Sequence, residues 1–144
     1  MQILKIKTER RMIGDFGEKY AAKLLRKKGY RIVKRGYVAA GHEIDIVAQN
    51  RESVIFVEVK TRTVGKEDPR SPRPASAVTP DKQRGIITAA KYYMAGCGRG
   101  KSVRLDVIEV YLNREGKRPK VQRAVHMEGA FNYNTAHPKG WRKD

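Results

Sequence analysis

Two short runs of alternating, mostly β-branched residues constrain the fold of this 144-residue chain more than any other feature. The runs cover residues 43–48 and 54–60, and only residues 49–53 lie between them. β-branched and aromatic residues favour strands, and so short a connection favours an antiparallel hairpin. We therefore expect the two runs to pair in a sheet around which the rest of the chain folds.

The remaining segments predict a second helix, further strands and a helix at the beginning. Apolar residues at helical spacing predict a helix over residues 10–28, which Gly29 would close as a C-cap. Thr79, Pro80 and Asp81 have the pattern of an N-cap, a first-position proline and a first-turn acid, in front of a helix ending at Gly96. Strands are expected over 30–35, 103–111 and 121–125, turns over 36–41 and 113–116, and a proline-rich loop over 62–80.

The resulting order, α-β-β-β-α-β-β, predicts an α/β fold with a mixed central sheet flanked by helices. The length is near the commonest domain size, so we expect one domain. This domain would cover residues 1–131, and residues 132–144 would form a poorly ordered C-terminal tail.

The hairpin brings two carboxylates together. If Arg51 and Glu52 form its turn, Asp45 lies directly opposite Glu58, with Cβ atoms about 4.5–5.5 Å apart. Lys60 shares a face with Glu58, because side chains alternate along a strand. Carboxylates this close in an apolar strand repel each other and resist desolvation. Three outcomes remain open: one is protonated, both pair with cations in a structural cluster, or both bind a metal ion.

The metal outcome would suit Mg²⁺, which takes one or two protein carboxylates and keeps water and phosphate oxygens as its other ligands. The backbone carbonyl of Val59 could add a ligand. Lys60 would then orient or deprotonate the attacking water, or stabilise the phosphate.

Charge points to a polyanionic partner. Thirty-two Lys and Arg against fifteen Asp and Glu give a formal charge of +17, and a phosphate backbone attracts such a surface through counterion release. No stretch approaches the eighteen or so apolar residues of a membrane span, so we expect no membrane partner. The single cysteine, Cys97, fits a reducing compartment, and we expect a cytoplasmic location.

Several motifs together carry a family resemblance. They are Gly-Asp-Phe-Gly-Glu at 14–18, Glu-Ile-Asp-Ile-Val-Ala at 43–48 and Phe-Val-Glu-Val-Lys-Thr-Arg at 56–62, followed by matching runs at 77–83, 89–93, 103–108 and 126–131. The combination resembles the YraN-like family of bacterial proteins. The family usually has a glycine where this chain has His42.

The resemblance implies the restriction-endonuclease-like fold, shared with archaeal Holliday junction resolvases. In that superfamily an Asp and a Glu-x-Lys motif bind Mg²⁺ (or Mn²⁺) and hydrolyse phosphodiesters, and resolvases add a Glu from the first helix. Carried over, these residues are Asp45, Glu58, Lys60 and Glu18. The implied activity is that of a DNA nuclease selective for branched structures and acting as a homodimer. Because similar folds also host binding proteins, the alternative is a catalytically silent nucleic-acid-binding protein.

The remaining candidates are phosphate contacts and two helix glycines. Lys82 and Gln83 open the second helix, where free N–H groups can receive a phosphate. Gly14 and Gly17 would allow a close approach of helix and sheet or of a phosphate. The cationic candidates in the proline-rich loop are Arg62, Arg70 and Arg73.

Overall fold

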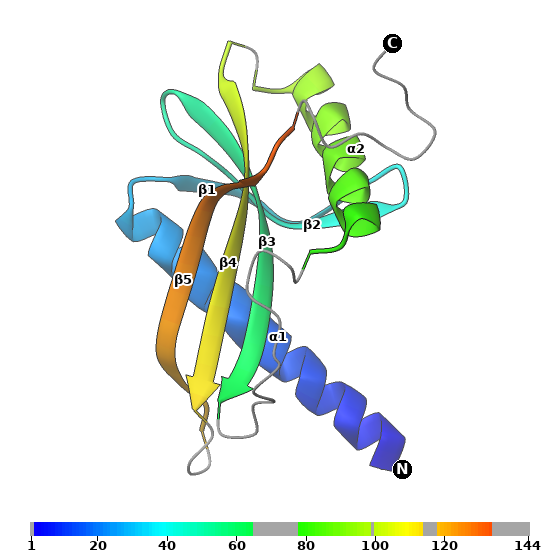
Figure 1. The fold of residues 1–144 in the computed structure, drawn as a ribbon, viewed down its shortest axis with the longest axis vertical. Coiled ribbons are helices and arrows are strands. Elements are labelled where there is room, and N and C mark those ends of the chain that lie inside the picture. Colours follow the sequence, from blue (N-terminus) through cyan, green and yellow to red (C-terminus); the bar gives the residue numbers. More distant parts are fainter. Residues whose placement is uncertain (1, 65–77, 99, 114–117, 134–144) are drawn as a thin grey trace.

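The computed structural model describes residues 2–64, 78–98, 100–113 and 118–133 (Figure 1). Its helices and strands follow the predicted order, α-β-β-β-α-β-β, and agree with the restriction-endonuclease-like fold. The strands form one sheet in chain order, β1-β2-β3-β4-β5. β3 and β4 run parallel and the other neighbours antiparallel, so the sheet is mixed. The elements are α1 (Gln2–Lys27), β1 (Arg31–Ala39), β2 (His42–Gln49), β3 (Ser53–Val64), α2 (Pro80–Gly96), β4 (Ser102–Asn113) and β5 (Lys120–Phe131).

Helix α1 packs on one face of the sheet. Ala21, Ala22 and Leu25 are fully or almost fully buried and join a core cluster with the inward residues of β2, β3 and β4. Gly29 ends the helix as predicted: it has φ +95°, and the N–H of Tyr30 donates to the Leu25 carbonyl at 3.0 Å. The helix begins earlier than predicted, at Gln2, and its first turns project past the sheet (Figure 1).

Helix α2 packs on the other face. Its N-cap is Thr79, as predicted, whose hydroxyl accepts from the N–H of Lys82 at 3.2 Å. Ile86, Ile87 and Ala90 are buried against Phe56 and the other inward residues of this face. The sheet is thus a middle layer between two helices, with an apolar core on each side.

Two strand boundaries were predicted wrongly because a glycine or a proline-rich neighbourhood was taken as the end of a strand. Residues 36–39 belong to β1 rather than to a turn: Gly36 has φ +66° inside the strand, and the turn is Ala40–Gly41, with φ 52° and 78°. β3 continues through Arg62 to Val64, because its parallel ladder with β4 runs on to the pair Val64–Asn113.

The last strand is also longer than predicted, Lys120–Phe131 in place of 121–125, since its pairing with β4 extends over that length. Of the predicted tail, Tyr133 packs against the α2-side core, and residues 134–144 lie outside the described residues. So do residues 114–116 of the predicted turn and most of the predicted proline-rich loop. No helix in the described part of the chain is long and apolar enough to cross a membrane.

Candidate active site

The site lies where the sheet forks between β2 and β3. The printed sequence gives these strands a tight connection, and the structure places its turn as predicted: the N–H of Asn50 donates to the Ser53 carbonyl at 2.9 Å. The ladder between β2 and β3 then runs only as far as the pair Ile46–Val57. Beyond it, β2 pairs with β1 alone and β3 with β4 alone, so the strands diverge (Figure 1). The next residue on each strand carries a carboxylate.

These two carboxylates are Asp45 and Glu58, which the hairpin register predicted to face each other. The pairs Gln49–Val54 to Ile46–Val57 keep the predicted register, and one further step brings Asp45 opposite Glu58. In the structure Asp45 Oδ2 accepts from the N–H of Val59 at 2.8 Å. The Asp45 side chain therefore takes the backbone donor of β3 that no longer has a partner strand at the fork.

Glu58 is the buried member of the pair. Its side chain is only 5% exposed, and its Oε1 has no hydrogen-bond partner among the described residues. Burial raises its pKa to about 7, with the negative charge of Asp45 as the second cause, and the charges of Lys82 and Lys60 oppose the rise. A carboxyl of this kind holds a proton near neutral pH until a cation replaces it.

Two lysines approach the same oxygen of Glu58. Lys60 Nζ lies 3.5 Å from Glu58 Oε2, and Lys82 Nζ lies 4.0 Å from it. Lys60 comes from β3 itself, as its alternation predicted, whereas Lys82 reaches the site from the first turn of α2. Fixed positive charge therefore stands beside the carboxylate pair from two elements.

Glu18 of α1 lies in the same cleft. Together with Asp45, Glu58 and Lys60 it lines an open cleft of about 490 Å³. Burial raises the pKa of Glu18, and so does the charge of Asp45, while an ion pair with Arg35 at 3.3 Å lowers it. The structure thus brings all four predicted catalytic residues to one cleft.

Close approach of α1 to the cleft depends on Gly17. A Cβ at this position would overlap the Thr61 hydroxyl of β3, which confirms the predicted close contact of helix and sheet. Gly14 also lines the cleft, but a Cβ there would meet nothing within 4 Å, so the prediction of close packing is wrong for that glycine.

The donor set fits a hard divalent cation in number and in kind. Among the described residues no group of three or more His, Cys, Asp or Glu side chains is arranged to hold a metal. Mg²⁺ does not need one, because it typically takes one or two carboxylates and fills the remaining positions with water and substrate oxygens. The unpartnered Oε1 of Glu58 and the carboxylate of Asp45 would supply those ligands. A ligand from the Val59 carbonyl stays a prediction.

The predicted phosphate contacts divide into three groups. Arg62 lies in β3 rather than in a loop, and its Nε donates to the fully buried Glu109 at 2.8 Å. The Gln83 side chain turns back to the Val78 carbonyl at 3.0 Å. Only Lys82 faces the carboxylate pair, at the distance given above. Arg70 and Arg73 lie outside the described residues.

Sequence reasoning missed Arg35 as a partner of the site. It lies in β1 and pairs with both Glu18 at 3.3 Å and Asp15 at 3.2 Å. Its strand was expected to end at this residue, and no spacing within the chain indicates that α1 crosses it. The sequence did contain a signal for such a cation: Asp15 and Glu18, the two acids of the Gly-Asp-Phe-Gly-Glu motif, stand at i and i+3 and therefore share a helix face.

The segments of this chain that match known proteins contain the main residues of the site. The sequence profile of the uncharacterised protein family UPF0102 matches residues 17–110. A UPF0102 protein of Caldanaerobacter subterraneus subsp. tengcongensis is 36% identical over 126 residues, which are 87% of this chain and 98% of that protein. UPF0102 proteins of Chlorobaculum parvum (41% over 122 residues; 83% and 91%) and Moorella thermoacetica (38% over 126; 85% and 97%) are similar to it as well. The matched segment contains Glu18, Asp45, Glu58, Lys60 and Lys82.

Proposed function

This chain belongs to the uncharacterised protein family UPF0102, the YraN-like family that its motifs indicate, and we propose that it is a Mg²⁺-dependent nuclease that hydrolyses phosphodiester bonds in DNA. Branched DNA is the proposed substrate. The observation that carries the proposal is the buried Glu58 with an unpartnered oxygen, next to Asp45 and two lysines at the fork of the sheet.

The acids would hold the metal. Asp45 is already oriented by the N–H of Val59, and Glu58 is held rigidly in a buried strand. When bound, Mg²⁺ would polarise the scissile phosphate and lower the pKa of a bound water. Glu18 lines the same cleft as this pair, where it could accept a proton from the attacking water.

The lysines would serve the phosphate. Lys60 is one-third exposed and 3.5 Å from Glu58, so its ammonium lies at the edge of the proposed metal site. There it can donate to a phosphate oxygen whose charge increases during hydrolysis. The formal charge of +17 would draw the polyanion to the protein before any such contact forms.

Cleavage assays test the proposal directly. Wild type is expected to cut branched DNA with Mg²⁺ or Mn²⁺, and Asp45→Ala is expected to bind the same DNA without cutting it. Exposed Glu52→Gln, in the turn of the same hairpin, is the matched control and should cut like wild type. If wild type and Asp45→Ala bind alike and neither cuts single-stranded, duplex or branched DNA, the enzyme proposal is wrong.

One observation favours a second candidate, a catalytically silent nucleic-acid-binding protein. Glu58, Glu18 and Asp45 each have a cation or backbone donor within reach, so the acids can persist as an ionic cluster. DNA binding would then fall steeply with salt and be indifferent to Mg²⁺. Calorimetric Mn²⁺ binding that is abolished by Glu58→Ala would exclude this candidate. We also propose a cytoplasmic location and a homodimer. Sedimentation of the purified protein would test the homodimer.

A further inference from the structure

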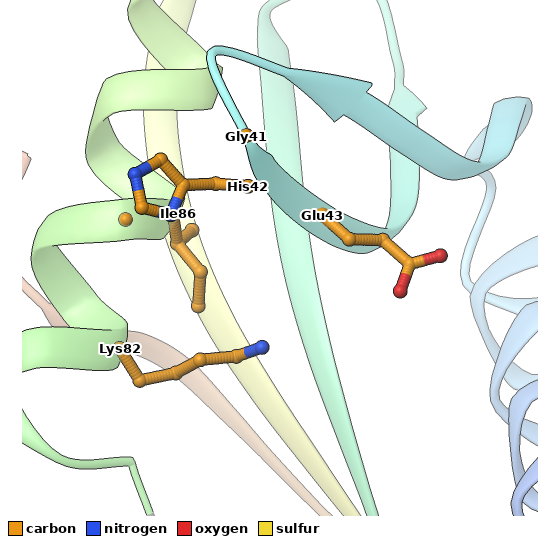
Figure 2. A pocket seen from close by; sticks show the side chains of 6 residues that line it. Gly41, His42, Glu43, Lys82 and Ile86 are labelled. Carbon is orange, nitrogen blue, oxygen red and sulfur yellow. The ribbon is translucent and has the colours of Figure 1, made fainter.

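Lys82, the lysine of α2 near Glu58, also lines a second hollow on the α2 side. A notch of about 130 Å³ is lined by Gly41, His42 and Glu43 of the β1–β2 hairpin and by Lys82, Gly85 and Ile86 of α2. In Figure 2 the Lys82 ammonium extends from α2 toward β2. The same ammonium is 4.0 Å from Oε2 of Glu58, which lines the cleft.

The notch owes its shape to a glycine. A Cβ at Gly85 would come within 2.5 Å of His42 Nδ1, so a side chain at this position would displace the imidazole from where it lies against the helix. Figure 2 shows the His42 ring beside α2 at this point. Lys82, Gly85 and Ile86 stand at i, i+3 and i+4 and therefore share one helix face. The contact at Gly85 thus places the His42 ring beside the helix face that carries Lys82.

The polar groups around the notch favour an anion. Lys82 brings three donors, 45% of its side chain is exposed, and the His42 ring adds polar nitrogens. The one acid in the lining, Glu43, directs its carboxylate away from α2 (Figure 2) and acts instead on Glu18, whose pKa its charge raises. The volume suits a phosphate-sized group together with a few waters.

We infer that this notch binds the phosphate next to the scissile phosphate, with Lys82 as its principal contact and His42 as its wall. The inference rests on the proposed nuclease function and extends it: the substrate would be gripped at two successive phosphates, one at the carboxylate pair and one in the notch. Lys82 would be the residue that fixes their relative position.

Binding of small nucleotides tests the inference without any cleavage. With Mg²⁺ present at fixed salt, the full chain should bind thymidine 3′,5′-bisphosphate about tenfold more tightly than thymidine 5′-monophosphate, the gain typical of one charge-assisted contact. Lys82→Ala should abolish most of this advantage, and Lys82→Arg should restore part of it. Lys23→Ala, which removes an exposed lysine of α1, should keep the advantage and controls for net charge.

A second readout comes from the imidazoles, of which the chain has only three. Bisphosphate should shift the ring proton resonances of His42 in wild type and not in Lys82→Ala. Equal preference for bisphosphate in wild type and Lys82→Ala, or a His42 resonance that does not respond, would overturn the inference.

Parallel cleavage of branched DNA separates this inference from the function it rests on. If wild type cuts DNA but its preference for the bisphosphate is unchanged in Lys82→Ala, the nuclease proposal stands and the phosphate site in the notch is wrong. If wild type cuts no DNA but its preference for the bisphosphate is lost in Lys82→Ala, the nuclease proposal is wrong and the site binds two phosphates without cleaving.

Discussion

Glu58→Gln is expected to stabilise the metal-free protein, and to do so increasingly as the pH rises. The folded protein holds a proton on Glu58 up to a pKa of about 7, whereas the unfolded chain releases it near the ordinary glutamate pKa of 4.5. Between these values the folded state binds more protons than the unfolded state, so the free energy of unfolding falls as the pH rises. Glutamine keeps the shape of the protonated carboxyl and cannot ionise, so the variant escapes this loss.

The size of the effect follows from the burial of Glu58. A pKa difference of one corresponds to about 1.36 kcal/mol, so a pKa raised from 4.5 to about 7 corresponds to about 3 kcal/mol. The side chain is 5% exposed, so solvent screens little of this energy. The difference in free energy of unfolding between Glu58→Gln and wild type should grow by that amount between about pH 4 and about pH 8.

Urea denaturation in EDTA at several pH values measures this difference. Glu52→Gln, which removes an exposed carboxylate from the same hairpin, should show no such growth. Added Mg²⁺ should then stabilise wild type above pH 7 and leave Glu58→Gln unchanged, because the metal binds the ionised carboxylate. A pH profile of Glu58→Gln parallel to that of wild type would refute the reasoning, since Glu58 would then ionise as freely in the fold as in the unfolded chain.

Four further substitutions test the packing, the core charges and the chemistry. Gly17→Ala should destabilise the protein in urea, because overpacking against Thr61 costs about 1–3 kcal/mol. Gly14→Ala, whose new Cβ would meet nothing within 4 Å, should instead stabilise the protein by up to about 1 kcal/mol through helix propensity. Equal effects of the two substitutions would contradict the close contact of Gly17 with Thr61. Asp106→Ala should lower the free energy of unfolding by about 3–5 kcal/mol. The reason is that this fully buried carboxylate accepts hydrogen bonds from an arginine, a histidine and a backbone N–H. A loss below about 1 kcal/mol would contradict a stabilising role of these hydrogen bonds. Lys60→Ala should lower the DNA cleavage rate about 10²-fold or more while fluorescence anisotropy shows little loss of DNA binding, and a rate loss no larger than the binding loss would reduce Lys60 to a phosphate contact.

The centre of the fold and of the site could be predicted because both depend on local rules. A two-residue turn at Arg51 and Glu52 fixes the register of β2 and β3 by counting alone, so Asp45 and Glu58 had to approach each other. Helix ends were equally accessible, since Thr79 and Gly29 act through their own backbone neighbourhoods.

What could not be predicted depends on contacts between distant elements. Gly36 is a turn residue by composition, yet it stays in β1 because the ladder with β2 continues on both sides of it. Arg62 was expected to face a phosphate, but the buried Glu109 of β4 takes its guanidinium. Nothing in the spacing of α2 shows that its first turn will lie above the fork, which is why Lys82 was expected at a helix terminus rather than at Glu58.

The two candidate functions differ most clearly in what they require of Glu58. A purely structural cluster gains little from burying a carboxylate whose Oε1 has no partner, because the desolvation cost is not recovered and a glutamine or an apolar residue would fill the site more stably. The same burial would suit the proposed metal site, because the two lysines near Oε2 do not return the pKa of Glu58 to its ordinary value, and a cation at Oε1 would stabilise the ionised carboxylate further. The fork between β2 and β3 also suits a metal site. It frees the N–H of Val59 to donate to Asp45, and it separates the strands where substrate oxygens would complete the coordination of the metal. An energetically costly carboxylate just beyond the end of the β2–β3 ladder therefore supports the proposed metal site over the purely structural cluster.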